Sequence, residues 1–246
     1  MPLDAIARAD GLNARYAALP AQDRLARALD DPALGPVALV SSFGADSVVL
    51  LHMVSRIAPD LPVLFLDTLM LFPETLAYQR DLARRLDLRD VRVITPDRAA
   101  LFARDPDALL HRAAPDDCCA LRKTAPLTAA LRGFDGWVTG RKRFQAAIRA
   151  ELPVFEAEPG TGRIKINPLA DWSAADIAAY IATHELPRHP LIARGYPSIG
   201  CMPCTSRVAP GEDHRAGRWR GQDKTECGIH VVDGRVVPGS RQEDAA

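Results

Sequence analysis

Five cysteines are the residues of this 246-residue chain whose types and spacing most directly indicate chemistry. They fall as an adjacent pair, Cys118 and Cys119, a CxxC at Cys201 and Cys204, and a lone Cys227. Five cysteines cannot all pair in disulfides, which argues against a disulfide framework. Metal binding or catalysis is therefore favoured over structural disulfide bridges. Four thiolates suffice for a tetrahedral zinc or a cubane iron–sulfur cluster. Adjacent side chains point about 100° apart on a helix, which favours the bulkier multi-iron group.

The lone cysteine lies in a polar segment with features of a reactive thiol. Lys224 favours the thiolate, Gly228 gives the backbone freedom, and His230 follows within a few residues of Cys227. From composition alone, an unused cysteine near the end of a chain is the favoured explanation of this residue. Cys227 is therefore a candidate nucleophile that needs support from other motifs.

A second candidate site is the run Ser41-Ser42-Phe43-Gly44-Ala45-Asp46-Ser47, between an apolar run and a predicted helix. Backbone N–H groups and the helix dipole at such a junction can hold an anion, and hydroxyl groups add hydrogen bonds. The run is neither a Walker loop nor a GxGxxG motif. A plain strand-to-helix turn with a polar cap explains it about as well, so the run alone leaves both interpretations open.

Alternating strands and helices must position these groups. Short aliphatic or β-branched runs after turn residues predict strands over 36–40, 63–66, 91–95 and 136–139, and an edge strand over 164–166. Apolar spacing and caps predict an amphipathic N-terminal helix and helices over 45–57, from Pro73 to about 86, 101–110, 118–131 and 173–184. This alternation predicts an α/β fold with a parallel sheet and right-handed crossovers.

Composition narrows the class of protein. The chain is 48% apolar and 25% charged, with 31 Lys and Arg against 31 Asp and Glu, as in ordinary globular proteins. The formal net charge of zero gives no bulk attraction to nucleic acid or an anionic membrane, so an anionic ligand needs a local basic site. We find no apolar run near the roughly 20 residues of a membrane span and no secretory signal. We therefore expect a cytoplasmic protein with no nucleic-acid partner and no membrane partner.

Together these motifs make the chain resemble the assimilatory, thioredoxin-dependent adenylyl-sulfate (APS) reductases. The SxGxDS pattern is similar to the PP-loop of adenylating pyrophosphatases and sulfonucleotide reductases, and Phe43, where ATP users have a second glycine, is typical of the reductases. The resemblance spans roughly residues 36–230. It rests on the phosphate loop, Phe65-Leu66-Asp67-Thr68, Phe72-Pro73-Glu74-Thr75, Cys118-Cys119 with Lys123, Gly140-Arg141-Lys142-Arg143, Asn167-Pro168-Leu169, Gly195-Tyr196, Ser198-Ile199-Gly200-Cys201, Gly217-Arg218-Trp219 and Glu226-Cys227-Gly228-Ile229-His230.

The resemblance implies a Rossmann-like PP-loop fold, of the adenine nucleotide alpha hydrolase-like kind, with a parallel sheet and a mobile C-terminal tail. It divides the chain into an N-terminal helical segment (1–35), a sulfonucleotide reductase domain with an iron–sulfur site (36–210) and a catalytic tail (211–246). It is also compatible with a homo-oligomer.

The implied activity is reduction of APS to sulfite and AMP, in sulfate assimilation toward cysteine. Cys227 would attack the sulfate sulfur, expel AMP and become S-sulfocysteine, which thioredoxin or a glutaredoxin-like protein would then reduce. Cys118, Cys119, Cys201 and Cys204 would ligate one [4Fe-4S] cluster per subunit, with an electrostatic and architectural role. The resemblance implies substrate contacts at Ser41, Ser42, Phe43, Gly44, Ser47, Leu66, Asp67, Thr68, Lys123, Gly140, Arg149, Arg215, Arg218 and His230.

Two departures from the family pattern concern the substrate loops. Many members have glycine where Leu69 stands, and Ser-Pro and Thr often precede the arginine that here follows Ala146-Ala147-Ile148 as Arg149. Three other functions stay open. They are reduction of the 3′-phosphorylated nucleotide (PAPS) by a family branch that commonly lacks the cluster cysteines, an ATP pyrophosphatase for tRNA thiolation, and a zinc-stabilised nucleotide-binding module without catalysis.

Overall fold

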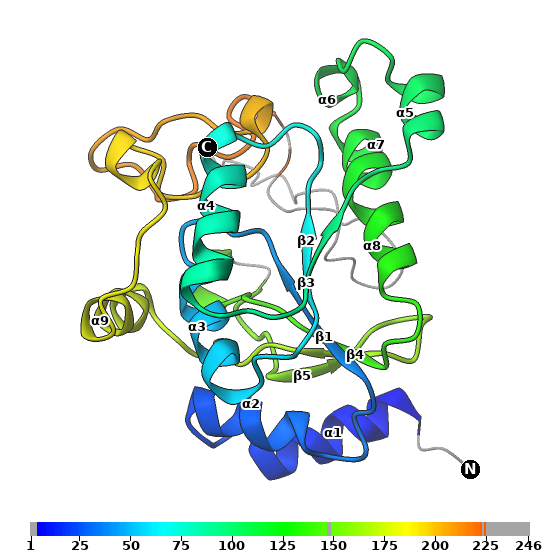
Figure 1. The fold of residues 1–246 in the computed structure, drawn as a ribbon, viewed down its shortest axis with the longest axis vertical. Coiled ribbons are helices and arrows are strands. Elements are labelled where there is room, and N and C mark those ends of the chain that lie inside the picture. Colours follow the sequence, from blue (N-terminus) through cyan, green and yellow to red (C-terminus); the bar gives the residue numbers. More distant parts are fainter. Residues whose placement is uncertain (1–3, 147–148, 223, 225–246) are drawn as a thin grey trace, which may run out of the picture.

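A six-stranded sheet forms the centre of the computed structural model, which describes residues 4–146, 149–222 and 224 (Figure 1). The strand order is β3-β2-β1-β4-β6-β5. The strands are β1 (Val37–Ser41), β2 (Val63–Leu66), β3 (Val91–Ile94), β4 (Gly136–Val138), β5 (Phe155–Ala157) and β6 (Ile164–Ile166). All neighbours pair in parallel except β5, which is antiparallel to β6. The predicted α/β class and parallel sheet are confirmed.

The prediction that residues 164–166 form an edge strand is wrong. Lys165 of β6 is paired with Trp137 of β4 on one side and with Glu156 of β5 on the other, so β5 occupies the edge. β5 has only three residues and follows Pro153, which leaves almost no strand pattern to detect. The short antiparallel strand β5 therefore depends on its pairing with β6.

Helices cover both faces of the sheet, and alternating side chains separate two cores. Leu39 and Phe65 face the larger core, and Ala38 and Leu64 face a smaller core under α8. The larger core also receives buried residues from α1 (Ala5–Tyr16), α2 (Ala21–Leu29), α3 (Ser47–Ile57), α4 (Pro73–Arg85) and α9 (Ala174–Thr183). The two N-terminal helices thus share a core with the sheet, lying below it in the view of Figure 1.

Local signals predicted several of these helices well. Pro73 occupies the first turn of α4. Ser173 caps α9, where its Oγ accepts a hydrogen bond from Asp176 N at 3.1 Å and Asp176 Oδ2 accepts one from Ser173 N at 2.8 Å. Helix α3 begins at Ser47, later than predicted, because the preceding residues form a loop. The second N-terminal helix, α2, was not predicted.

Two other predicted helices are divided in the structure. The expected helix over 101–110 is instead α5 (Arg98–Arg104) and α6 (Leu110–Ala113), since Pro106 cannot continue a helix. The expected helix over 118–131 is α7 (Pro115–Cys119), a π-helical turn (Ala120–Thr124) and α8 (Ala125–Ala130). No helix in the described part of the chain has the length and hydropathy of a membrane span.

His189 connects α4 to the segment that leads to Cys201. Its side chain is 1% exposed, its Nδ1 accepts a hydrogen bond from Leu191 N at 3.2 Å, and its Nε2 lies 3.0 Å from Thr75 Oγ1. An Nδ1 that accepts leaves the proton on Nε2, which donates to the threonine, so the ring is neutral. Burial lowers the pKa of His189 to about 4 from 6.5.

We expect this histidine to make folding sensitive to mild acid. The unfolded chain binds a proton on His189 near pH 6.5, but the folded chain binds it only near pH 4. The contribution of His189 to stability is therefore fully present above pH 6.5 and is lost as the pH falls from 6.5 to 4. The free energy of unfolding should fall by about 2 kcal/mol from this residue between pH 7 and pH 5. Urea unfolding at both pH values should show a smaller difference for His189→Gln. An equal difference in His189→Gln and in the wild type would contradict the assignment. His184→Gln, a change at an exposed histidine, serves as the control.

Candidate active site

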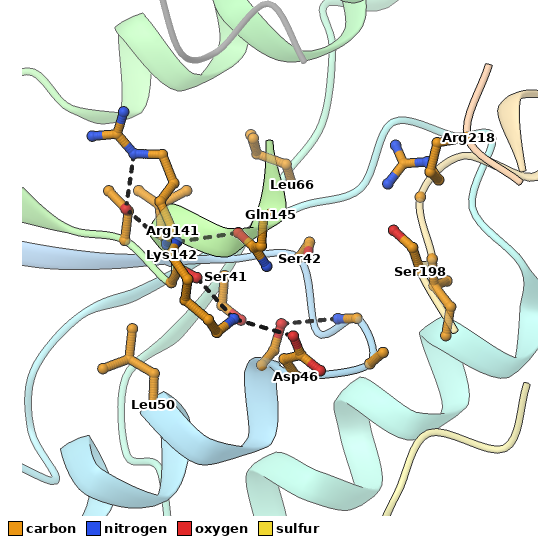
Figure 2. Close-up of a pocket in the computed structure, with 18 of the residues that line it drawn as sticks. Ser41, Ser42, Asp46, Leu50, Leu66, Arg141, Lys142, Gln145, Ser198 and Arg218 are labelled. Carbon is orange, nitrogen blue, oxygen red and sulfur yellow. Dashed lines mark hydrogen bonds and ion pairs between the residues drawn. The ribbon is translucent and has the colours of Figure 1, made fainter. Parts of the chain in front are cut away.

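A pocket of about 230 Å³ opens at the carboxyl ends of β1, β2 and β4. Parallel sheets place their ligands at this edge. The walls come from the phosphate loop, the end of β2, the turn after β4, and two later segments near Cys201 and Trp219. In Figure 2, Lys142 and Asp46 lie on one side of this space, and Ser198 and Arg218 lie on the other.

Two serine side chains of the phosphate loop accept hydrogen bonds from the loop's own backbone. Phe43 N donates to Ser41 Oγ at 3.2 Å, and Gly44 N donates to Ser47 Oγ at 3.0 Å. Phe43 has a φ of +48° and is completely buried, with its ring edge-to-face on Phe65 at 5.3 Å. The aromatic ring therefore anchors the loop in the core and turns its polar groups toward the pocket.

Most residues with a predicted substrate role line this one pocket. These are Ser41, Ser42, Gly44, Ser47, Leu66, Thr68, Lys123, Gly140, Arg149, Arg215 and Arg218. Phe43 and Asp67 are not part of the lining. The Phe43 side chain points into the core, and Asp67 Oδ1 accepts a hydrogen bond from Leu69 N at 2.9 Å, which shapes the turn after β2. His230 and Cys227 lie outside the described residues.

Four cysteines from two distant segments lie beside the pocket. Cys118 and Cys119 end α7, Cys201 immediately precedes a 3-10 turn (Met202–Cys204), and Cys204 is the last residue of that turn. The first three are buried and Cys204 is half-buried. The pKa of Cys118 is raised to about 11, mainly by burial. Arg122 opposes this rise, and the nearby charges of Cys201 and Cys204 contribute to it. This mutual influence shows that both segments meet in space.

Hydrogen bonds fix the Cys201 segment to the end of β2. Thr68 Oγ1 lies 3.2 Å from Cys201 Sγ, Met202 N donates to Met70 O at 2.8 Å, and Leu71 forms an antiparallel bridge with Cys201. Burial also raises the pKa of Cys204, and the positive charges of Lys123, Arg218 and Lys224 partly oppose this rise. The thiols thus have cations around them that would offset thiolate charge.

The four thiols are also the residues to consider as ligands of a metal or cofactor. Within residues 4–146, 149–222 and 224, no three His, Cys, Asp or Glu side chains have the spacing of a single-ion site. A cluster of several irons takes each thiolate on a different metal atom, so its ligands lie further apart than those of one ion. The four largely buried thiols on two segments, with basic neighbours, are the residues here that could hold such a group.

A buried ion pair supports the helix that carries the cysteine pair. Arg122, in the π-helical turn, donates from Nη2 to Asp105 Oδ2 at 2.7 Å and from Nη1 to Thr68 O at 3.1 Å. Both charged side chains are at most 5% exposed. Lys123, the next residue, lines the pocket and lowers the pKa of Cys204, so it is close to both the pocket and Cys204. π-helical turns often occur at functional sites.

Arginines form the wall opposite the phosphate loop. The Arg218 guanidinium lies 4.4 Å from the centroid of the Trp219 ring, and its buried Nε has no hydrogen-bond partner among the described residues. Gly200 makes room for it, because a Cβ at that position would overlap the guanidinium. An arginine with an unpartnered donor at the mouth of a pocket is suited to an anionic ligand.

Sequence reasoning missed several residues of the site. Asp46, Lys142, Gln145 and Trp219 were not given roles, although all four line the pocket. Gln145 Oε1 accepts hydrogen bonds from Arg149 Nη1 at 2.6 Å and Lys142 N at 3.2 Å, and so positions the arginine. The signal was available for Lys142 and Trp219, which belong to the motifs that carried the resemblance.

Comparison with known proteins supports one family. The phosphoadenosine phosphosulfate reductase domain model matches residues 36–207. Proteins named adenosine 5′-phosphosulfate reductase from Mesorhizobium japonicum and Chelativorans sp. are each 51% identical, covering 92% and 94% of this chain and 88% and 94% of theirs. The crystal structure of phosphoadenylyl-sulfate (PAPS) reductase from Candida auris, a phosphate complex, matches with a TM-score of 0.68 and 30% identity, over 81% of this chain and 96% of that one.

Proposed function

We propose that this chain, which belongs to the phosphoadenosine phosphosulfate reductase domain family, reduces adenosine 5′-phosphosulfate to sulfite and AMP. The observation that carries the proposal is the pocket itself. It joins a phosphate loop at a helix N-terminus and an opposing arginine wall, and its lining includes Cys201, one of the four thiols. The names of the relatives favour the substrate without a 3′-phosphate.

The proposed reaction has two steps, both centred on Cys227. In the first, the thiolate of Cys227 attacks the sulfate sulfur. A sulfur–sulfur bond forms as the sulfur–oxygen bond to the phosphate breaks, and AMP leaves with that electron pair. In the second, a thioredoxin dithiol supplies two electrons and becomes a disulfide, the sulfur–sulfur bond of the adduct breaks, and sulfite leaves. One proton of the dithiol goes to Cys227, which becomes a thiol again, and the other is released. AMP leaves as an anion, so Lys123, Arg149, Arg215 and Arg218 would stabilise the charge that develops.

We further propose that Cys118, Cys119, Cys201 and Cys204 hold one [4Fe-4S] cluster. When bound, the cluster would supply local charge and a rigid link between the two segments. The chain's own residues support this arrangement. Thr68 orients Cys201, Arg122 fixes the helix after Cys119, and Lys224 pairs with Asp116 in the first turn of α7.

Anaerobically purified protein incubated with APS, without thioredoxin, tests the proposal. We expect release of one AMP per chain and a mass increase of one sulfonate on the intact protein, which thioredoxin then removes as sulfite. Turnover of PAPS should be slower than that of APS, and ATP should yield no AMP. Absence of both AMP and the adduct would reject the reductase, and AMP released from ATP would instead support the pyrophosphatase.

A further inference from the structure

Lys142 is a buried lysine in the wall of the pocket. Its side chain is 2% exposed, and its Nζ lies 3.1 Å from Asp46 Oδ2 and 3.1 Å from the carbonyl oxygen of Gly140 (Figure 2). Burial lowers the pKa of Lys142, and the carboxylate of Asp46 raises it again. Lys142 thus joins the turn after β4 to the phosphate loop, although Lys142 and Asp46 are 96 residues apart in the chain.

Asp46 is the only carboxylate in the pocket lining within the described part of the chain. Its side chain is 30% exposed, so it faces the pocket, while Lys142 is enclosed behind it. The other charged side chains of that lining are basic: Lys123, Arg141, Lys142, Arg149, Arg215 and Arg218. An uncompensated carboxylate at the phosphate loop would repel a phosphate or sulfate group.

We propose that Lys142 is a positioning residue that neutralises Asp46 and ties the phosphate loop to the Gly140 turn, so that the pocket accepts a nucleotide with anionic groups. The lysine acts through Asp46, because its side chain is only 2% exposed and its ammonium donates to Asp46 Oδ2 and to the Gly140 carbonyl oxygen. This inference rests on the proposed function only in taking an adenylate as the ligand. It goes further by giving a role to a cation that would not touch the substrate.

Binding of AMP without turnover, measured by calorimetry on the full chain, tests the inference. Lys142→Met keeps the volume but leaves Asp46 unpaired, and should weaken AMP roughly 30-fold. The double variant Asp46→Asn/Lys142→Met removes both charges and should bind AMP within about threefold of the wild type. A double variant as weak as the single one would show that Lys142 contacts the anion itself, and would overturn the inference.

Two further variants keep the test decisive. If Lys142→Met does not fold, the more exposed Asp46→Asn serves alone. It should bind AMP at least as tightly as the wild type, and tenfold weaker binding would reject the idea. Lys165→Met is the matched control, since that lysine is 3% exposed and lies 3.6 Å from Glu158 but does not line the pocket. AMP affinity should change less than about twofold in this control.

The readout also separates this inference from the proposed function. If the wild type releases AMP from APS but the variants do not follow the expected order, only the role of Lys142 is wrong. If the wild type neither binds AMP nor releases it from APS, both are wrong.

Discussion

Cys227→Ser should lose turnover of APS by roughly 1,000-fold or more while binding AMP as the wild type does. A serine hydroxyl is not ionised at neutral pH and is a poor nucleophile at sulfur, so the first step should stop before any covalent bond forms. The measurement is the intact mass after incubation with APS in the absence of a reductant. The wild type should gain one sulfonate and the variant none.

The control is a substitution of a cysteine that is a proposed cluster ligand and not the proposed nucleophile. Cys204→Ser changes a half-buried thiol of the four-cysteine set and leaves Cys227 in place, so any residual turnover of that variant should still pass through the adduct. An adduct that persists in Cys227→Ser would place the nucleophile elsewhere in the chain.

Cys201→Ser should lose the bound iron and sulfide and lower APS turnover by roughly 100-fold or more. Cys201 is buried, contacts the Thr68 hydroxyl and is bridged to Leu71, so it connects the proposed cofactor to the end of β2. Because cofactor binding contributes to folding, the variant should also unfold at a lower temperature. Iron, sulfide and zinc analysis and visible absorption of anaerobically purified protein provide readouts independent of activity.

Met202→Leu is the matched control, because Met202 is 52% exposed in the same turn and keeps all four thiols. It should retain the cofactor and the stability of the wild type. A full complement of iron in Cys201→Ser would remove that cysteine from the ligand set. Zinc in place of iron in the wild type would instead favour a structural metal.

Much of the fold could be predicted because its signals are local. The bounds of β2 are those expected, and the caps at Pro73 and Ser173 mark α4 and α9. The misses have physical causes. β5 is three residues long and depends on pairing with β6. The π-helical turn over Ala120–Thr124 comes just before Pro126, which has no N–H to continue a regular helix and was not used as a signal.

The site was predictable as a set of motifs but not as a geometry. Parallel strands bring their carboxyl ends to one edge, so the phosphate loop, Leu66 and Gly140 meet as expected. The direction of a side chain depends on backbone angles that no motif specifies, which is why Phe43 lies in the core. The pairing of Lys142 with Asp46 requires β1 and β4 to be neighbours, and that strand order is a property of the whole sheet.

The space shared by Gly200 and Arg218 makes these two positions an epistatic pair. A methyl group at Gly200 would displace only the end of a flexible side chain, so Gly200→Ala should leave the protein folded and well expressed while removing the cation from the face of Trp219. Once Arg218 is alanine, the same change at Gly200 has nothing left to displace. In a mutational scan of APS reduction, the two losses should therefore not add, although each position taken alone would look indispensable.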